Sequence, residues 1–220
     1  MEMPLRDGEE SVLELFEALG RTTAQFGAFH PRTLGVANRL AIAFWKIGDI
    51  PQAVGLLEQA IEASAGSGQD YAVRSQLLCT LAEIMVEQAS WERAAMLYRE
   101  VLESSVRRFG SNHASSLTAK GDLALVLSEL GEMAEACELE QEAWESARKH
   151  LGKTHPVTCV LAWNRSLRLE SNGDGNAARA ILVNDLAWLL TEDDANLETD
   201  HHVVKAMLAQ RWGSECAAVC

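Results

Sequence analysis

The sequence predicts an all-α fold, an α-solenoid of antiparallel helix pairs, because several features recur at one interval close to 40 residues. Turn residues lie 41, 42 and 42 residues apart: Gly48, Ala89, Gly131 and Gly173. An alanine follows each turn after five residues: Ala53, Ala94, Ala136 and Ala178. A small residue stands seven positions before each turn: Ala41, Ala82, Ala124 and Ser166. A glycine opens each unit: Gly27, Gly68, Gly110 and Gly152.

The composition favours helix and limits the classes of partner. The 220 residues include only 4 prolines, and 23% of them are charged, as in ordinary soluble proteins. The 32 acidic and 19 basic side chains give a net charge of -13, which repels phosphate backbones and disfavours nucleic-acid binding. We therefore expect neutral or basic partners.

Targeting and redox signals indicate a cytoplasmic protein. No apolar run approaches the roughly 18 residues that cross a bilayer, so we expect no membrane insertion. The N-terminus MEMPLRDGEE lacks the basic and apolar regions of a secretory signal. The cysteines are odd in number and irregularly spaced, which indicates free thiols in a reducing compartment. They are Cys79, Cys137, Cys159, Cys216 and Cys220.

The chain before the first full unit predicts a single helix. Residues 1–8 are expected to form a loose leader. From Ser11 onward, apolar side chains follow the spacing of one helix face: Val12, Leu15, Phe16 and Leu19. This segment aligns with the second helix of a unit, so we expect a half-repeat that covers the first full unit.

Each full unit predicts two helices joined by a turn. Pro31 suits the first helical position, because its missing N–H would have no intrahelical partner there. Small residues at Ala41 and Ala53 would let the helices of the first unit approach closely. In the second unit, Ala89 replaces the glycine that favours a left-handed C-cap. In the fourth unit, Asp185 takes a position that is Ala or Val elsewhere, so we expect this helix to bury less surface.

The segment beyond the fourth unit predicts a covering helix. The polar stretch TEDDANLETD precedes a helical pattern at residues 201–212. A terminal repeat needs a cover with a polar outer face, which this helix can supply. We therefore predict about ten helices: one leading helix, four pairs and one cap. The expected domain organisation is a single solenoid over residues 9–212, followed by a flexible cysteine-containing tail at residues 213–220.

The repeat unit resembles a tetratricopeptide repeat, in the longer form of about 42 residues found in kinesin light chains. The segments FGAFHPRTL (26–34), FGSNHASSL (109–117) and LGKTHPVTC (151–159) resemble the loop between repeats of that family. GD-x-x-x-A at 48–53 and GE-x-x-x-A at 131–136 add to the resemblance. It covers about residues 9–191 and implies a right-handed solenoid. The sequence departs from the family where paired asparagines often stand, at Asn38-Arg39, Cys79-Thr80, Gly121-Asp122 and Trp163-Asn164.

The resemblance implies that the first helix of each unit lines an inner, concave wall. In that register the expected peptide-binding residues are Asn38, Ile42, Trp45, Cys79, Glu83, Val86, Leu125, Ser128, Trp163 and Leu167, with Gly121 in the same row. Apolar patches with tryptophan are typical of interaction surfaces. The alternative is that neighbouring units or the C-terminal helix cover these side chains. Glu87, Glu129 and Glu170 fall near the rim, either as a solvated face or as an acidic rim that steers a basic segment.

The histidines favour structural roles over metal binding. His30, His113 and His155 stand one per loop, too far apart to share a metal ion, so we expect them to cap and pack helices. His201 and His202, with Cys216 and Cys220, form a mixed set of candidate metal ligands, but the spacing matches no standard zinc pattern. We expect no metal and no cofactor.

The sequence contains no catalytic motif that we recognise. GSGQD (66–70) lacks the Gly-Lys-Ser/Thr of a phosphate-binding loop, and no Gly-x-Ser-x-Gly elbow is present. We therefore predict a non-catalytic scaffold that binds a protein or peptide, neutral to basic with apolar anchors, in the concave groove. Two alternatives stay open. One is self-association, as in a homodimer, through the cap helix or the tail, and the other is a cysteine tail presented for modification.

Overall fold

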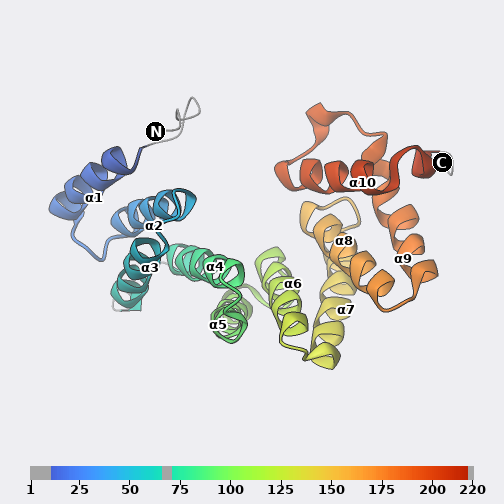
Figure 1. The fold of residues 1–220 in the computed structure, drawn as a ribbon, viewed down its shortest axis with the longest axis horizontal. Coiled ribbons are helices and arrows are strands. Elements are labelled where there is room, and N and C mark those ends of the chain that lie inside the picture. The colour runs from blue at the N-terminus through green and yellow to red at the C-terminus, as the bar shows by residue number, and fades with distance from the viewer. Residues whose placement is uncertain (1–10, 66–70, 218–220) are drawn as a thin grey trace. The chain divides into compact units, whose positions relative to one another are not determined.

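The structure is a computed structural model that describes residues 11–65 and 71–217. These residues form ten α-helices, in sequential antiparallel pairs, and no strand (Figure 1). The helices are α1 (Val12–Phe26), α2 (Pro31–Lys46), α3 (Ile50–Ala65), α4 (Tyr71–Glu87), α5 (Trp91–Phe109), α6 (Ala114–Glu129), α7 (Met133–His150), α8 (Pro156–Ser171), α9 (Gly175–Ile181) and α10 (Thr199–Ala217). The all-α prediction, with a leading helix, four pairs and a final helix, is confirmed.

Membrane insertion was not expected from the sequence. Within residues 11–65 and 71–217, no helix combines the length and the apolar composition that a membrane span requires.

Histidine side chains cap three of the first helices of the pairs. The Nδ1 atoms of His30, His113 and His155 each accept a hydrogen bond from the backbone N–H two residues later, at 3.1 to 3.2 Å. His30 and His113 also stack on the preceding Phe26 and Phe109, with ring centroids 4.8 and 4.5 Å apart. The cap satisfies a backbone donor that has no partner within the helix. The expected capping and packing role is confirmed.

The predicted turn residues all adopt a left-handed backbone. The φ angles are 84° at Gly48, 82° at Gly131 and 85° at Gly173. Ala89 has a φ of 52° and is the one non-glycine residue with a positive φ in the described part of the chain. Its Cβ makes this conformation cost about 1–2 kcal/mol. The turn of the second pair is therefore the strained one, as the sequence predicts.

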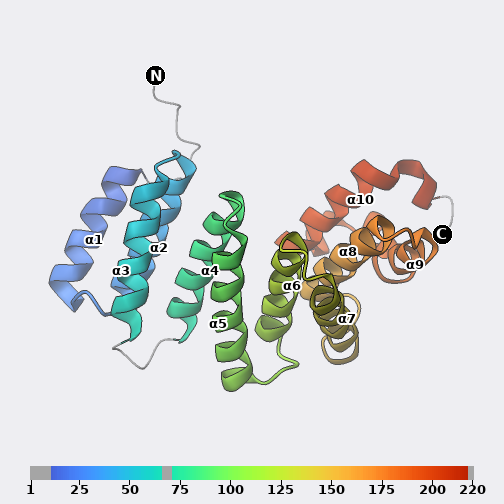
Figure 2. The ribbon, with the colours of Figure 1, turned by 60° about the horizontal axis from the view of Figure 1, so that its bottom comes forward.

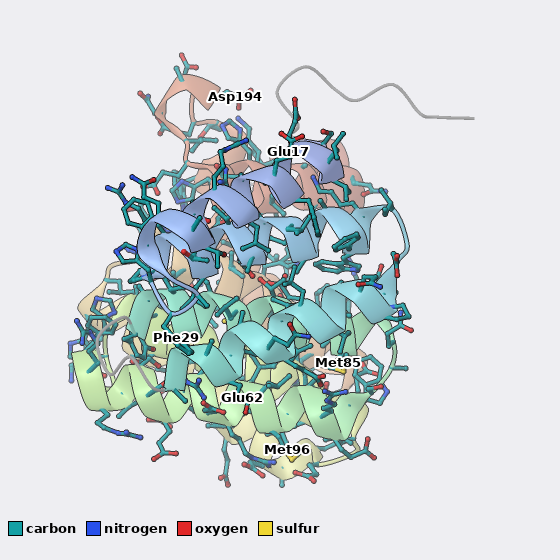
Figure 3. All side chains as sticks on the ribbon, turned by 90° about the vertical axis from the view of Figure 1, so that its left-hand side faces the viewer. Glu17, Phe29, Glu62, Met85, Met96 and Asp194 are labelled. Atoms are coloured by element: carbon teal, nitrogen blue, oxygen red, sulfur yellow. The ribbon has the colours of Figure 1, made fainter. Side chains whose placement is uncertain are left out.

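The chain divides into two compact units, Met1–Val101 and Leu102–Cys220, with the boundary inside α5. In unit 1, α1 packs on α2, α2 packs on α3 and α4, and α3 packs on α4. Figure 2 shows these helices alongside one another, and Figure 3 views the unit from the side of α1, with Glu17 labelled. Ala41 and Ala53 are fully buried where α2 and α3 meet, so small residues do permit this close approach. The single solenoid expected over residues 9–212 stays a prediction.

In unit 2, α7 packs on α6 and α8, and α8 also packs on α6, α9 and α10. The contact between α6 and α8 depends on Gly121. A Cβ atom added at Gly121 would lie 2.5 Å from Cδ2 of Leu161, which is closer than carbon atoms approach in proteins. Glycine therefore allows these two helices to come together.

The second helix of the fourth pair is not continuous. α9 ends at Ile181 and is followed by a π-helical turn (Leu182–Leu186) and a 3-10 turn (Ala187–Leu190). A second 3-10 turn (Asp194–Asn196) leads to α10, which is longer than the predicted segment 201–212. α10 packs on α8 and on the turn at 187–190. The irregular segment between α9 and α10 thus reverses the chain so that α10 packs on α8.

The expectation that Asp185 lies in a less buried helix is wrong. Asp185 is only 1% exposed and lies within the π-helical turn. Its carboxylate is 3.3 Å from Nε of Arg148 on α7, which partly balances the buried charge.

Candidate functional site

Six of the expected peptide-binding residues lie on two neighbouring helices of unit 1, and we call this set the α2–α4 face. It consists of Asn38, Ile42 and Trp45 on α2 and Cys79, Glu83 and Val86 on α4. Spacings of four and three residues place each set on one side of its helix, and α2 contacts α4. All six residues are half-buried or exposed, whereas the core face of α2 is buried. The α2–α4 face is therefore accessible within unit 1.

Trp45 is held in place on the α2–α4 face. Its indole Nε1 donates a hydrogen bond to the carboxylate of Glu87, at the C-terminal end of α4. Burial by the surrounding protein raises the pKa of Glu83 above its ordinary value, although part of this side chain stays exposed to solvent. The face thus combines an oriented tryptophan with a partly desolvated carboxyl group and the apolar side chains of Ile42 and Val86.

Asn38 adds a polar group without a partner to this face. Its Oδ1 atom is buried and has no hydrogen-bond partner among the described residues. An unpaired buried acceptor costs about 1–3 kcal/mol.

Two of the three rim glutamates make contacts within the protein. Glu87 accepts from Trp45, as described above, and Glu170 of α8 accepts from the guanidinium of Arg211 on α10. Glu129 is exposed on α6. The carboxylates of Glu87 and Glu170 therefore orient neighbouring side chains of their own units.

The expected residues of unit 2 have different environments. Leu125 is 41% exposed on α6, and the half-buried Ser128 donates its hydroxyl to the backbone oxygen of Leu125 at 2.6 Å. Leu167 is half-buried and packs on the core at the C-terminal end of the unit. Leu125 and Ser128 remain accessible to a ligand.

Trp163 is a core residue and has little surface with which to contact a ligand. It is 7% exposed and packs in a cluster with residues of α9, of the turns that follow it and of α10. Val204 and Leu208 of α10, both 1% exposed, belong to that cluster. The alternative that the C-terminal helix covers part of the row is correct at this position, so Trp163 is not part of the site proposed below.

The structure contains a buried ionic network that the sequence did not reveal. Glu140 of α7 lies 2.6 Å from Nε of Arg168 and 3.6 Å from Nη1 of Arg165, both on α8. The Glu140 side chain is 2% exposed, and those of Arg165 and Arg168 are largely buried, at 14% and 10% exposed. In the repeat register, Glu140 stands where the earlier pairs have Leu57 and Tyr98. A glutamate at a position that is otherwise buried could have predicted a buried ion pair from the sequence.

The thiol of Cys159 on α8 is buried. Burial raises its pKa to about 12, and the charge of Asp185 contributes to this shift. Burial also raises the pKa of Asp185, and the charge of Arg148 opposes that shift. A thiol that stays protonated at neutral pH is a weak nucleophile and a poor metal ligand.

His201 has a structural role in unit 2. Its Nδ1 accepts from the backbone N–H of Glu198 at 3.1 Å, so the neutral ring carries its proton on Nε2. Nε2 lies 2.9 Å from the backbone oxygen of Thr154, to which it donates. Within the described residues, no group of three or more His, Cys, Asp and Glu side chains is arranged to hold a metal ion. Cys220, one of the candidate ligands, lies outside them.

A small pocket lies between α6, α8 and the start of α10. Its volume is about 60 Å³. Its lining consists of Thr118, Gly121, Asp122, Val157, Val160, Leu161, Asn164 and Asp200. Of these, sequence reasoning identified Gly121 alone as an inward position. Asp122 and Asn164 directly follow the predicted inward positions Gly121 and Trp163, and this adjacency could have identified them as lining residues. Asp200 lines the pocket because α10 packs on α8, which the repeat pattern does not predict.

Comparisons with known proteins identify the repeat. The sequence model of the tetratricopeptide repeat family matches residues 116–157. No curated protein sequence gives a significant match. Among solved structures, BtubC (BKLC) from P. vanneervenii has a TM-score of 0.73 at 17% identity, over 95% of this chain and 85% of that chain. A putative kinesin light chain from Podosopora anserina with nearly identical TPR-like repeats has a TM-score of 0.65 at 22% identity, over 91% of this chain and 87% of that chain.

At such identities the likeness shows the fold, which agrees with the antiparallel pairs and the repeated turns described above. Tetratricopeptide repeats generally serve as scaffolds for protein interaction and are typically non-catalytic. Residues 116–157 therefore match a tetratricopeptide repeat, and the chain shares the fold of structural neighbours of the kinesin-light-chain type.

Proposed function

We propose that this protein is a non-catalytic scaffold that binds an extended protein or peptide segment on the faces of its first helices. In unit 1 the binding surface is the α2–α4 face, and in unit 2 it includes Leu125 and Ser128. The partner is neutral to basic, because the protein carries a net charge of -13.

The observation that carries this proposal is the accessibility of the whole α2–α4 face. Trp45 is partly exposed, and its ring is oriented by Glu87. A fixed tryptophan loses little conformational entropy on binding, which is why tryptophan is enriched at binding hot spots. Ile42 and Val86 are half-buried and offer apolar contact. An extended segment presents apolar side chains along its length, so it fits this surface.

The test begins with a selection from a displayed random-peptide library on the immobilised protein. The affinity of the selected peptides is then measured by calorimetry for the parent protein and for Trp45→Ala. Loss of a hot-spot tryptophan should weaken binding by at least about 2 kcal/mol, or roughly thirtyfold. Ile42→Ala should weaken it to a smaller extent.

A matched control is Met96→Ala, which truncates an apolar side chain that is 63% exposed on α5, outside the α2–α4 face (labelled in Figure 3). This variant should bind the peptides like the parent protein. Equal affinities of the parent and Trp45→Ala proteins, with helicity unchanged, would show that the α2–α4 face is not the site. Failure to select any peptide that binds would count against the proposed function itself.

Self-association remains a second candidate, because α10 exposes two apolar side chains one turn apart. Val203 is 47% exposed and Met207 is 41% exposed. If they form a contact between copies, the mass measured by light scattering should rise with concentration, and Val203→Glu with Met207→Glu should abolish that rise. The hypothesis of a modifiable cysteine tail concerns residues 213–220, of which Cys220 lies outside the described residues.

A further inference from the structure

A hollow at the C-terminal end of α7 has a positively charged lining, and we call it the α7 hollow. Its volume is about 450 Å³, and its lining consists of Glu145, Arg148, Lys149 and Lys153. All four residues are exposed. Three positive charges and one negative charge give the lining a formal charge of +2. The protein as a whole carries -13, so this surface has the opposite sign to the rest of the chain.

The two lysines of the α7 hollow have no ionic partner. Most basic side chains of the described chain are paired, as Lys120 is with Glu142. Lys149 and Lys153 make no hydrogen bond or ion pair within residues 11–65 and 71–217. Lys149 follows Glu145 by four residues, a spacing that allows an ion pair on a helix. Glu145 instead accepts a hydrogen bond from Nε2 of Gln141 at 2.9 Å, so the ammonium group of Lys149 stays available.

The third cation, Arg148, is held by two contacts within unit 2. Its guanidinium carbon lies 5.0 Å from the centre of the Trp144 ring, and its Nε lies 3.3 Å from Oδ1 of Asp185. Nη1 and Nη2 make no hydrogen bond among the residues that the structure describes. Asp185 is buried and also feels the charge of Lys153, so in its ionised form it reduces the local charge from +2 to +1. The site therefore stays positive, with a guanidinium whose position is already fixed.

The dipole of α7 accounts for only part of this cluster. Arg148 and Lys149 lie in the last turn of α7, where cations offset the partial negative charge of a helix C-terminus. Lys153 lies beyond that end, after the C-cap Leu151. It therefore adds a positive charge to the same hollow that the end of the helix does not require.

We propose that the α7 hollow binds a phosphate monoester group. Such a group carries a charge of about −1.5 to −2 at pH 7 and three strong acceptor oxygens, which suits a lining with three cationic side chains. Arginine can donate to two phosphate oxygens at once, and lysine contributes a compact charge. A carboxylate carries a single charge and would neutralise less of the site.

The charge of the whole protein restricts what can carry the phosphate. A nucleic acid or an anionic membrane presents many negative charges, which a net charge of -13 repels. A single phosphate, on a small molecule or on a phosphorylated side chain of a neutral or basic segment, avoids this repulsion. The inference goes beyond the proposed function, because the α7 hollow shares no residue with the α2–α4 face or with Leu125 and Ser128.

The test uses small probes, so it does not depend on knowing the ligand. Nα-acetyl-O-phosphoserine N-methylamide is titrated into the full-length ¹⁵N-labelled protein at about pH 7.5, where the phosphate is mostly dianionic, and amide shifts are followed by NMR. The corresponding serine and glutamate compounds are the matched ligands. We expect saturable shifts at residues 145–153 with a Kd on the order of millimolar, weaker binding of the glutamate compound and no saturation with the serine compound.

Inorganic phosphate, titrated in the same way, distinguishes the two sources of the group. Tighter binding of the phosphoserine compound than of inorganic phosphate would support a phosphorylated side chain as the ligand. Equal affinities would support a small phosphate compound. Saturation at residues 145–153 supports the phosphate site in both cases.

Lys149→Gln and Lys153→Gln each remove one positive charge from the lining. Each should weaken binding of the phosphoserine compound about twofold to fivefold. The matched control is Arg179→Gln, which removes one positive charge at an exposed position of α9 outside the lining and should leave the affinity unchanged. An equal loss in all three variants would show that only net charge matters and would overturn the site.

Failure of this inference is distinguishable from failure of the proposed function. Absence of saturable shifts at residues 145–153, or equal affinity for the glutamate compound, overturns the phosphate site. Binding of the selected peptides that depends on Trp45 is measured separately, so the scaffold function can stand without this site.

Discussion

Replacement of Ala89 by glycine should stabilise the protein, because Ala89 is strained at the turn between α4 and α5. Its φ of 52° lies in the left-handed region, which costs an alanine about 1–2 kcal/mol. The same turn position holds glycine in the other pairs, with φ between 82° and 85°. Glycine removes the strain but increases the entropy of the unfolded chain, which costs about 0.5–1 kcal/mol. With mid-range values of about 1.5 and about 0.75 kcal/mol, the net expected gain in the free energy of unfolding is about 0.75 kcal/mol.

Urea unfolding followed by circular dichroism measures this gain as a shift of the midpoint at unchanged slope. In a thermal scan the gain corresponds to a rise in Tm of about 1–4 °C for a chain of this size. If the units unfold in separate transitions, the shift belongs to the transition of unit 1, which contains Ala89.

The matched control is Ala43→Gly, inside α2 of the same unit. Ala43 has ordinary helical geometry, so the same chemical change should destabilise the protein by about 1 kcal/mol. The opposite signs of the two effects identify the backbone conformation as the cause. A loss of stability for Ala89→Gly similar to that for Ala43→Gly would refute the reasoning.

Three further predictions concern unit 2. Gly121→Ala should destabilise the protein by about 1–3 kcal/mol, because the new Cβ would lie 2.5 Å from Leu161, and Leu161→Val should relieve part of this loss in a double-mutant cycle. Glu140→Ala should lower the free energy of unfolding in urea by about 3–5 kcal/mol, because it leaves two largely buried guanidinium groups without their carboxylate. The control Glu138→Gln should change the free energy of unfolding by less than about 0.5 kcal/mol. Burial raises the pKa of Asp185 above its ordinary 3.8, so in the acid range above 3.8 the native state binds more protons than the unfolded state. The free energy of unfolding should therefore fall as pH rises through the raised pKa, and Asp185→Asn should remove this decrease in unfolding curves recorded from about pH 4 to 7; an identical pH profile for both proteins would contradict the assignment.

Part of the proposed binding surface could be predicted from the sequence. The register of the repeats placed Asn38, Ile42 and Trp45 on one side of α2, and the structure shows this side accessible. The same register placed Trp163 in the row, where α10 covers it. Periodicity shows which residues share a helix face, but it does not show what packs against that face.

The sequence by itself determined the local geometry of this protein. Each turn glycine, each histidine cap and each buried alanine acts through its own backbone or its nearest helix, so the repeat pattern was enough to place ten helices. Even the strain at Ala89 is a local property of one residue type in one conformation.

Only the tertiary structure decided how unit 2 ends. The burial of Asp185 and Trp163 and the pocket beside Asp200 all depend on the irregular segment after α9, which returns α10 to α8. These contacts join residues far apart in the sequence, and no repeat interval relates them. The free energy of such contacts depends on the surface that the whole unit buries, so a local pattern cannot specify them.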